Sequence, residues 1–281
     1  MKTREIHMPE TLEAFAQYLV ETEKSRATIE KYMRDIRYFI VYMEGRAIDK
    51  QSVLDYKAQL LNKYAVRSAN SMLAALNMYL RFAGRYDLTV KQYRVQKDAY
   101  CPEKKELTKD EYMALIRVAE QKQNRRLALV IQTICATGIR VSELSGITIE
   151  AVKRGEAVVS CKGKIRRIFI ISALRKKLLE YAQDRGIHTG TIFTTKNGKP
   201  INRSNIWKEM KHLCKMAGVE PGKVFPHNLR HLFARTFYGI EKDIAKLADV
   251  LGHSNINTTR IYIMTTGIEH QRRMETLKLI L

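Results

Sequence analysis

Hydrophobic residues recur every three or four positions along most of this chain, which is the spacing of an amphipathic helix. Four such stretches lie near the N-terminus, at residues 11–21, 27–43, 49–64 and 68–82. The second is the clearest, with one apolar face formed by Ile29, Tyr32, Met33, Ile36, Phe39 and Ile40. The pattern predicts a helical bundle over residues 1–86.

The helical period is lost over residues 87–107, which contain Pro102 and a pair of lysines, and this segment is predicted to be an interdomain linker. The run Thr108-Lys-Asp-Glu111 has the T-x-x-E spacing of a capping box and predicts the start of a new helix. The helical pattern then continues to about Leu144 and returns from Ser204 onward. We therefore predict a second domain over residues 108–281.

Two short β-like runs, Ala157–Ser160 and Arg167–Ile171, interrupt the helical pattern of this second domain. They flank a basic stretch with a glycine, CKGKIR at 161–166, and together predict a β-hairpin. The predicted fold class is therefore mainly α with one small β-sheet, in which an all-helical domain precedes an α+β domain.

Positive charge is the strongest feature of the composition. Lys and Arg number 50 against 29 Asp and Glu, a net charge of +21, while 45% of the residues are hydrophobic. A folded chain this basic is typical of proteins with a polyanionic partner, nucleic acid first and an anionic membrane surface second. Residues 151–200 carry 12 basic and 3 acidic side chains, so we expect this region to contact the polyanion.

Other patterns are missing from the sequence. The four cysteines, Cys101, Cys135, Cys161 and Cys214, form no C-x-x-C pair and are read as reduced thiols of a cytoplasmic protein. No apolar run approaches the roughly 18 residues of a membrane span, and the N-terminus has no secretory signal. Walker A, GxGxxG and HExxH motifs are also missing, so we expect no cofactor and no metal. Because no membrane span is present in the sequence, we also expect no membrane partner.

Three separated segments contain the residue types of phosphoryl transfer: ATGIRVSEL at 136–144, PHNLRH at 226–231 and LGHSNINTTRIY at 251–262. The reaction needs rigid, multiply donating cations around the phosphate oxygens, together with a nucleophile and a proton donor. Arginine provides a planar bidentate fork that lysine lacks. Two arginines, two histidines, a hairpin lysine and a tyrosine supply these groups without a metal.

The segments resemble the signature of the tyrosine recombinase/integrase family and are close to its Xer-type members. Six positions match the catalytic set of that family in order along the chain: Arg140, Lys162, His227, Arg230, His253 and Tyr262. The resemblance is dense from about 108 to 263. It extends to the run TIEKYMRDIRYF at 28–39, which is similar to the core-binding domain of the family.

The resemblance implies a fold and a partner. It implies a SAM-like helical core-binding domain over residues 1–86 and a catalytic domain over 108–281, which would encircle double-stranded DNA. Recombination would proceed through a Holliday junction in a homo-tetramer on two DNA sites. The sequence specifies neither the DNA target nor any accessory protein.

The resemblance also implies a role for each residue. Tyr262 would attack a DNA phosphate to give a 3′-phosphotyrosyl link, and Lys162 would protonate the leaving 5′-oxygen. Arg140 and Arg230 would clamp the non-bridging oxygens. His227 would move the tyrosine proton, and His253 would hydrogen-bond a phosphate oxygen.

Several assignments stay open at this point. Cys161 replaces the usual glycine and the turn is about one residue shorter than in the family, so Lys164 is an alternative to Lys162. Glu143 either orients Arg140 or forms a solvated pair with it, and His231 is expected to be a buried structural residue. The terminal run Ile268–Leu281 is read as a short helix that docks on its own domain or on a neighbouring protomer.

Two other functions fit the same residues. A type IB topoisomerase shares phosphotyrosine chemistry but relaxes DNA without pairing sites. A catalytically silent DNA-binding protein could keep the fold without the reaction, although the complete set of six residues disfavours this alternative.

Overall fold

The computed structural model describes residues 8–94, 106–161, 164–195, 198–263 and 275–276. It divides the chain into two compact units, Met1–Lys97 and Asp98–Leu281, which we consider separately. The expected fold class is confirmed, because helices dominate and a two-stranded sheet is present. Lys162 and most of the terminal run Ile268–Leu281 lie outside the described residues, so the structure does not bear on either expectation.

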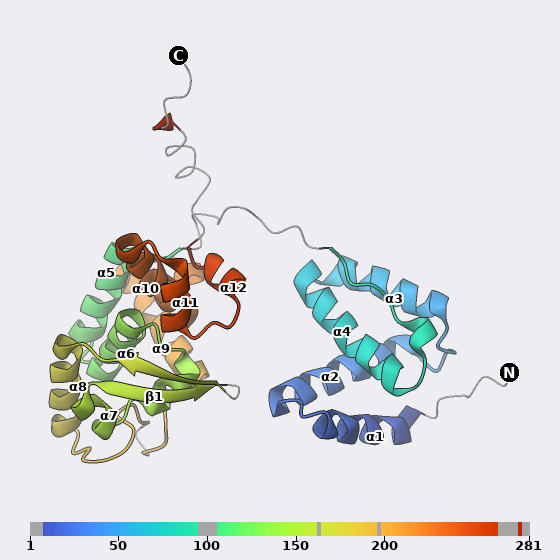
Figure 1. Ribbon diagram of the computed structural model, residues 1–281, viewed down its shortest axis with the longest axis horizontal. Coiled ribbons are helices and arrows are strands. Elements are labelled where there is room, and N and C mark those ends of the chain that lie inside the picture. The colour runs from blue at the N-terminus through green and yellow to red at the C-terminus, as the bar shows by residue number, and fades with distance from the viewer. Residues whose placement is uncertain (1–7, 95–105, 162–163, 196–197, 264–274, 277–281) are drawn as a thin grey trace. The chain divides into compact units, whose positions relative to one another are not determined.

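The first unit is a bundle in which each of the four predicted helices is present (Figure 1). Its elements are α1 Met8–Glu21, α2 Arg26–Met43, α3 Lys50–Lys63, α4 Val66–Phe82 and the short 3-10 helix η1 Tyr86–Leu88. Ser25 caps α2, and Asp49 forms a capping box with Ser52 at the start of α3. All four α-helices contribute to the core, which includes Phe15, Leu19, Ile36, Phe39, Tyr56, Leu73, Leu76 and Tyr79.

The second unit has its own core and carries the three motif segments. Its elements are α5 Lys109–Gln121, α6 Arg125–Thr137, η3 Val141–Gly146, α7 Ile149–Arg154, β1 Glu156–Cys161, β2 Lys164–Phe169, α8 Ser172–Asp184, α9 Arg203–Ala217, η4 Pro221–Lys223, α10 Pro226–Glu241, α11 Ile244–Leu251 and α12 Ile256–Arg260. In Figure 1, α10, α11 and α12 form the orange to red group of this unit. The predicted capping box is confirmed, since Thr108 and Glu111 bond each other's backbone at the start of α5.

The ends of the predicted linker pack with the units on either side of it. Leu88 and Val90 belong to the core of the first unit, whereas Leu107 belongs to the core of the second. The domain division into 1–86, 87–107 and 108–281 remains a prediction.

One predicted helix ends earlier than expected. The pattern predicts helix to Leu144, but α6 stops at Thr137, where Gly138 adopts a φ of +62°. A Cβ at Gly138 would lie 2.5 Å from the ring of Phe233, so glycine fits this position for two reasons. The turn brings Arg140 to the start of η3 instead of leaving it inside a long helix.

The hairpin is present, but β1 is one residue longer at each end than predicted, and β2 spans Lys164–Phe169 instead of Arg167–Ile171. Cys161 pairs with Lys164, and Val159 pairs with Arg166, so residues expected in the turn belong to β2. The alternation of buried and exposed side chains fixes the pairing register of the two strands, because Ala157 and Ile168 face the core while the other face of the sheet is exposed. As a result, β2 begins at Lys164, two residues after Lys162 in the sequence.

Within the described ranges, no helix combines the length and apolarity of a bilayer-crossing segment.

Candidate active site

Arg140 is held by a buried carboxylate. Its Nη1 donates to Glu143 Oε1 at 3.0 Å, and its backbone N–H donates to Glu143 Oε2 at 2.9 Å. The side chain of Glu143 is 1% exposed, whereas that of Arg140 is 31% exposed. This burial removes the solvated-pair alternative for Glu143, because the carboxylate fixes the guanidinium from inside while its outer edge faces solvent.

Arg230 lies deeper than any other charged residue in the described core, at 1% exposure. It projects from α10, where Pro226 in the first turn favours helix initiation, and the helix brings His227 and Arg230, three residues apart, onto one face. Its guanidinium donates to the carbonyl of Gly138, to that of Leu251 at 2.7 Å and to His253 Nε2 at 3.0 Å. Burial, together with the nearby charge of Arg140, lowers the pKa of Arg230 to about 10, which still leaves it charged at neutral pH.

Three successive carbonyls at the C-terminal end of α11 each accept a bond from a different arginine. Arg166 donates to Val250 at 2.6 Å, Arg230 to Leu251 at 2.7 Å and Arg140 to Gly252 at 3.4 Å. The last carbonyls of a helix have no partner inside it and carry partial negative charge. One helix end therefore aligns three guanidinium groups from η3, β2 and α10.

Sequence reasoning missed Arg166. The sequence pattern predicts this residue in a basic turn, but in the structure it lies on β2 with a side chain only 10% exposed, and its Nη2 bonds Glu143 Oε2 at 2.7 Å. The unusual density of arginine in the run KIRRIF was visible, but only the strand register shows which of the two adjacent arginines points inward.

His253 connects the arginine group to α12. Because a guanidinium can only donate, His253 Nε2 accepts from Arg230, and Nδ1 then donates to Thr259 Oγ1 at 2.9 Å. Burial and the surrounding arginines lower the pKa of His253 to about 4, which agrees with this neutral tautomer. The expected bond from His253 to a phosphate oxygen thus requires the ring to exchange its bond with Arg230.

Tyr262 packs against the same group and is 5% exposed. Its hydroxyl lies 3.3 Å from His227 Nε2, and its ring centroid lies 5.9 Å from the Arg230 guanidinium. The ring stacks on His231 with centroids 4.1 Å apart and planes inclined by 14°. His231 is therefore half-buried and faces the tyrosine, which corrects the expected full burial, while its structural role stays a prediction.

Five of the six predicted residues are thus brought together from separate elements: Arg140, His227, Arg230, His253 and Tyr262. Lys162 lies outside the described residues, as does the side chain of the alternative Lys164. The catalytic roles of all six stay predictions at this point. Within the described ranges, no cluster of His, Cys, Asp or Glu is arranged to hold a metal ion.

All three histidines of this group favour the neutral form. Burial lowers the pKa of His231 to about 4 and that of His253 to about 4, and it also lowers the pKa of His227, with Arg230 adding to each shift. In the unfolded chain each would titrate near its usual 6.5. The unfolded state therefore binds more protons between pH 6.5 and 4.

This difference predicts that the free energy of unfolding falls as the pH is lowered from 6.5 toward 4. Urea unfolding at pH 7, 6 and 5 measures it. The matched control is His231→Phe, which keeps an aromatic ring against Tyr262 but binds no proton, so its stability should depend less on pH than that of the parent. An identical pH dependence in both proteins would contradict the lowered pKa of His231.

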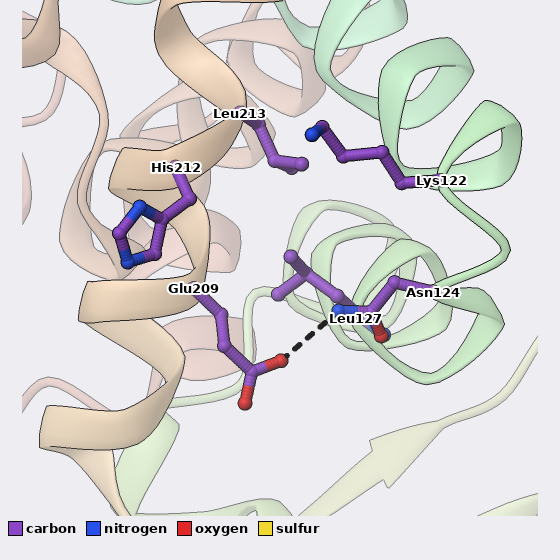
Figure 2. A pocket seen from close by; sticks show the side chains of 6 residues that line it. All are labelled: Lys122, Asn124, Leu127, Glu209, His212 and Leu213. Atoms are coloured by element: carbon purple, nitrogen blue, oxygen red, sulfur yellow. Dashed lines mark hydrogen bonds between the residues drawn. The ribbon is translucent and has the colours of Figure 1, made fainter.

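A separate recess of about 400 Å³ lies between α9 and the connection from α5 to α6 (Figure 2). Its lining contains none of the five residues above and consists of Lys122, Asn124, Leu127, Glu209, His212 and Leu213. Both Glu209 oxygens are already bonded, one to Asn124 at 3.2 Å and one to Arg126 at 2.7 Å. Because the carboxylate of Glu209 is already bonded, the recess lacks the converging polar groups that orient a ligand in a binding pocket.

Residues 105–267 match the Phage integrase family, and residues 12–86 match the "Phage integrase, N-terminal SAM-like domain" family. The chain belongs to the phage integrase family. It is 32% identical over 289 residues to the tyrosine recombinase XerA of Pyrococcus horikoshii, a match that covers 100% of this chain and 98% of the relative. It is accordingly a Xer-like, tyrosine-type site-specific recombinase.

Solved structures agree on the fold. A lambda integrase dimer bound to a COC′ core site has a TM-score of 0.74 at 18% identity, covering 92% of this chain and 95% of that chain. A lambda integrase tetramer bound to a Holliday junction has a TM-score of 0.73 at 18% identity, covering 92% and 78%. The match to the SAM-like family confirms the predicted type of the N-terminal bundle.

Proposed function

We propose that this recombinase cuts and rejoins double-stranded DNA through a 3′-phosphotyrosyl intermediate formed on Tyr262. The observation that carries the proposal is the position of the tyrosine hydroxyl, 3.3 Å from a histidine nitrogen and beside the buried Arg230. A nucleophile, a base within hydrogen-bond reach and fixed cations are the groups that phosphoryl transfer requires.

In the proposed reaction, the Tyr262 oxygen bonds to the phosphorus as the bond from phosphorus to the 5′-oxygen breaks. His227 accepts the phenolic proton, which its lowered pKa permits because the ring is neutral at pH 7. Lys162 delivers a proton to the leaving 5′-oxygen. Attack by another 5′-hydroxyl reverses these steps, so the phosphodiester energy is conserved and no cofactor is consumed.

Charge in the site supports this chemistry. Arg140 and Arg166 share the carboxylate of Glu143, and the guanidinium of Arg230 bonds two carbonyls and His253. The group therefore presents positive charge to a phosphate and to the additional negative charge of the transition state. Arg140 and Arg230 are proposed to contact the non-bridging oxygens, since Arg140 is partly exposed and Arg230 lies against the nucleophile. The net charge of +21 favours binding to DNA, with affinity that falls steeply as salt increases.

For the assembly, we propose a homo-tetramer on two DNA sites that exchanges strands through a Holliday junction. The resemblance in fold to lambda integrase, solved as a dimer on a core site and as a tetramer on a Holliday junction, supports this arrangement. In the same proposal the N-terminal unit and the catalytic unit grip the duplex, and the protein acts in the cytoplasm.

A nicked suicide substrate tests the function. Loss of a short strand 3′ of the cleavage site traps the covalent complex, which separates an enzyme from a silent DNA-binding protein. Products from a supercoiled plasmid that carries two sites then separate a recombinase from a topoisomerase. Relaxation without any exchange between sites would contradict recombination.

Lys162 rather than Lys164 is predicted to be the general acid. A substrate with a 5′-bridging sulfur has a leaving group that needs little protonation, so it should restore cleavage to Lys162→Ala by a large factor. Cleavage of the ordinary substrate by Lys162→Ala should fall far below the parent rate, while Lys164→Ala serves as the matched control. Rescue of Lys164→Ala instead would transfer the role to that residue.

A further inference from the structure

We propose that Arg166 is a positioning residue of the recombinase, one that holds Glu143 and thereby fixes Arg140 for phosphate binding. The inference rests on the proposed function, because it concerns the geometry of that reaction. It assigns a role to a side chain outside the six residues of the catalytic set.

The contacts of Arg166 link three separate elements. From β2, its Nη2 bonds Glu143 at 2.7 Å and its Nη1 bonds the carbonyl of Val250 at 2.6 Å. Glu143 in turn accepts from the side chain and the backbone of Arg140, on η3. The hairpin, the first arginine and the end of α11 are therefore joined through one guanidinium.

Glu143 needs this partner to stay charged where it lies. Burial alone raises the pKa of a carboxyl, but bonds from Arg166 and Arg140 outweigh it and hold the pKa of Glu143 below its usual value. Without Arg166, one carboxylate oxygen would lose its only side-chain donor in a buried position, which favours either protonation or movement of Glu143. Both outcomes loosen the support of Arg140.

The surroundings of Arg166 leave it little freedom. A Cβ on Gly252 would lie 2.5 Å from Arg166 Cδ and 3.2 Å from its Nε, so the glycine provides space for the side chain to pass. Gly252 also contributes the carbonyl that bonds Arg140. The arginine is thus wedged between a carboxylate and a helix end, as expected for a residue that fixes others and does not itself reach the phosphate.

Arg167 offers a matched control. It is the next residue on the same strand, points to the opposite face, is 70% exposed and forms only a 3.7 Å contact with Glu156. Arg166→Met and Arg167→Met therefore remove the same charge and a similar volume from adjacent positions. If only the loss of one positive charge mattered, both variants would be affected alike. If Arg166 positions Glu143, only Arg166→Met is affected.

The experiment measures single-turnover covalent capture on the suicide substrate and DNA affinity for the parent and both variants. We expect Arg166→Met to slow capture by about 10-fold or more, since misplacement of a phosphate-binding group is costly, while affinity changes by less than about 3-fold. Arg167→Met should capture DNA at nearly the parent rate. Equal rates for Arg166→Met and the parent would overturn the proposal.

A double-mutant cycle with Glu143→Gln identifies the route. If Arg166 acts through Glu143, adding Arg166→Met to Glu143→Gln should slow capture by less than about 2-fold further. If the double variant instead slowed capture by the product of the two single-variant factors, that route would be overturned. Rescue of Arg166→Met by the 5′-bridging sulfur substrate would also overturn it, because the arginine would then act on Lys162.

A second variant guards against a folding defect. Gly252→Ala displaces Arg166 without altering any charge, and Gly218→Ala introduces the same residue at the same φ of +64° where no atom lies within 4 Å of the new Cβ. Capture should be slowed by Gly252→Ala and retained by Gly218→Ala, with thermal unfolding reporting the folded state of each. If the parent protein captures no DNA at all, the proposed function fails, which is distinguishable from failure of the role of Arg166.

Discussion

Replacement of Tyr262 by phenylalanine is expected to abolish covalent attachment to DNA and to leave DNA affinity within about 2-fold of the parent. The phenylalanine ring keeps the packing that the structure shows, including the 4.1 Å stack on His231. Only the hydroxyl 3.3 Å from His227 is removed, and with it the atom that would bond to phosphorus. The measurement is an SDS-resistant adduct on the suicide substrate, together with gel-shift affinity.

Tyr238→Phe is the matched control for this experiment. Tyr238 packs with Tyr262 in the same small cluster, and its ring lies 5.8 Å from Lys242. Its loss of a hydroxyl should leave adduct formation unchanged. An adduct formed by Tyr262→Phe would contradict the assignment of the nucleophile.

Replacement of Arg140 or Arg230 by alanine is the second change with a large expected effect. Each should slow cleavage by about 10²-fold or more, because charge that develops in the transition state loses a fixed donor. DNA affinity should fall far less, since many phosphate contacts outside the site contribute to binding. Single-turnover cleavage at saturating protein separates the two quantities.

Two controls accompany these variants. Arg125→Ala removes the same charge from a surface pair with Asp184 and should cleave normally. Arg230→Lys keeps a charge in the buried position, where alanine would leave the carbonyls of Gly138 and Leu251 without their donor. If cleavage and affinity fell by equal factors in Arg140→Ala, that arginine would act only as a binding contact.

Local sequence signals predicted much of this fold because their causes are local. The T-x-x-E spacing at Thr108 needs only its own backbone to form a capping box, and it does so. The motif histidine and arginine of α10 share a face because three residues separate them in any helix. The pattern predicts helix past the end of α6 because the apolar period continues, whereas the chain leaves the helix at Gly138, a left-handed C-cap whose lack of a Cβ also makes room for the distant Phe233.

Local sequence signals did not predict every residue of the candidate site correctly. Arg140 and Tyr262 were found from motif spacing, whereas Arg166 was not, because a shift of one residue in strand register would have turned Arg167 inward in its place. His231 was misplaced for a related reason. Its direction on α10 follows from helix geometry, but the ring that covers it comes from beyond α12.

The alignment of three arginines on one helix end has a consequence for how such an enzyme can evolve. Like charges held in proximity destabilise the folded protein, and the charge of Arg140 adds to the larger effect of burial in lowering the pKa of Arg230. The same concentration of positive charge attracts a phosphate. Stability alone would therefore not favour three arginines at one helix end, and we expect the cluster to persist where selection acts on the reaction.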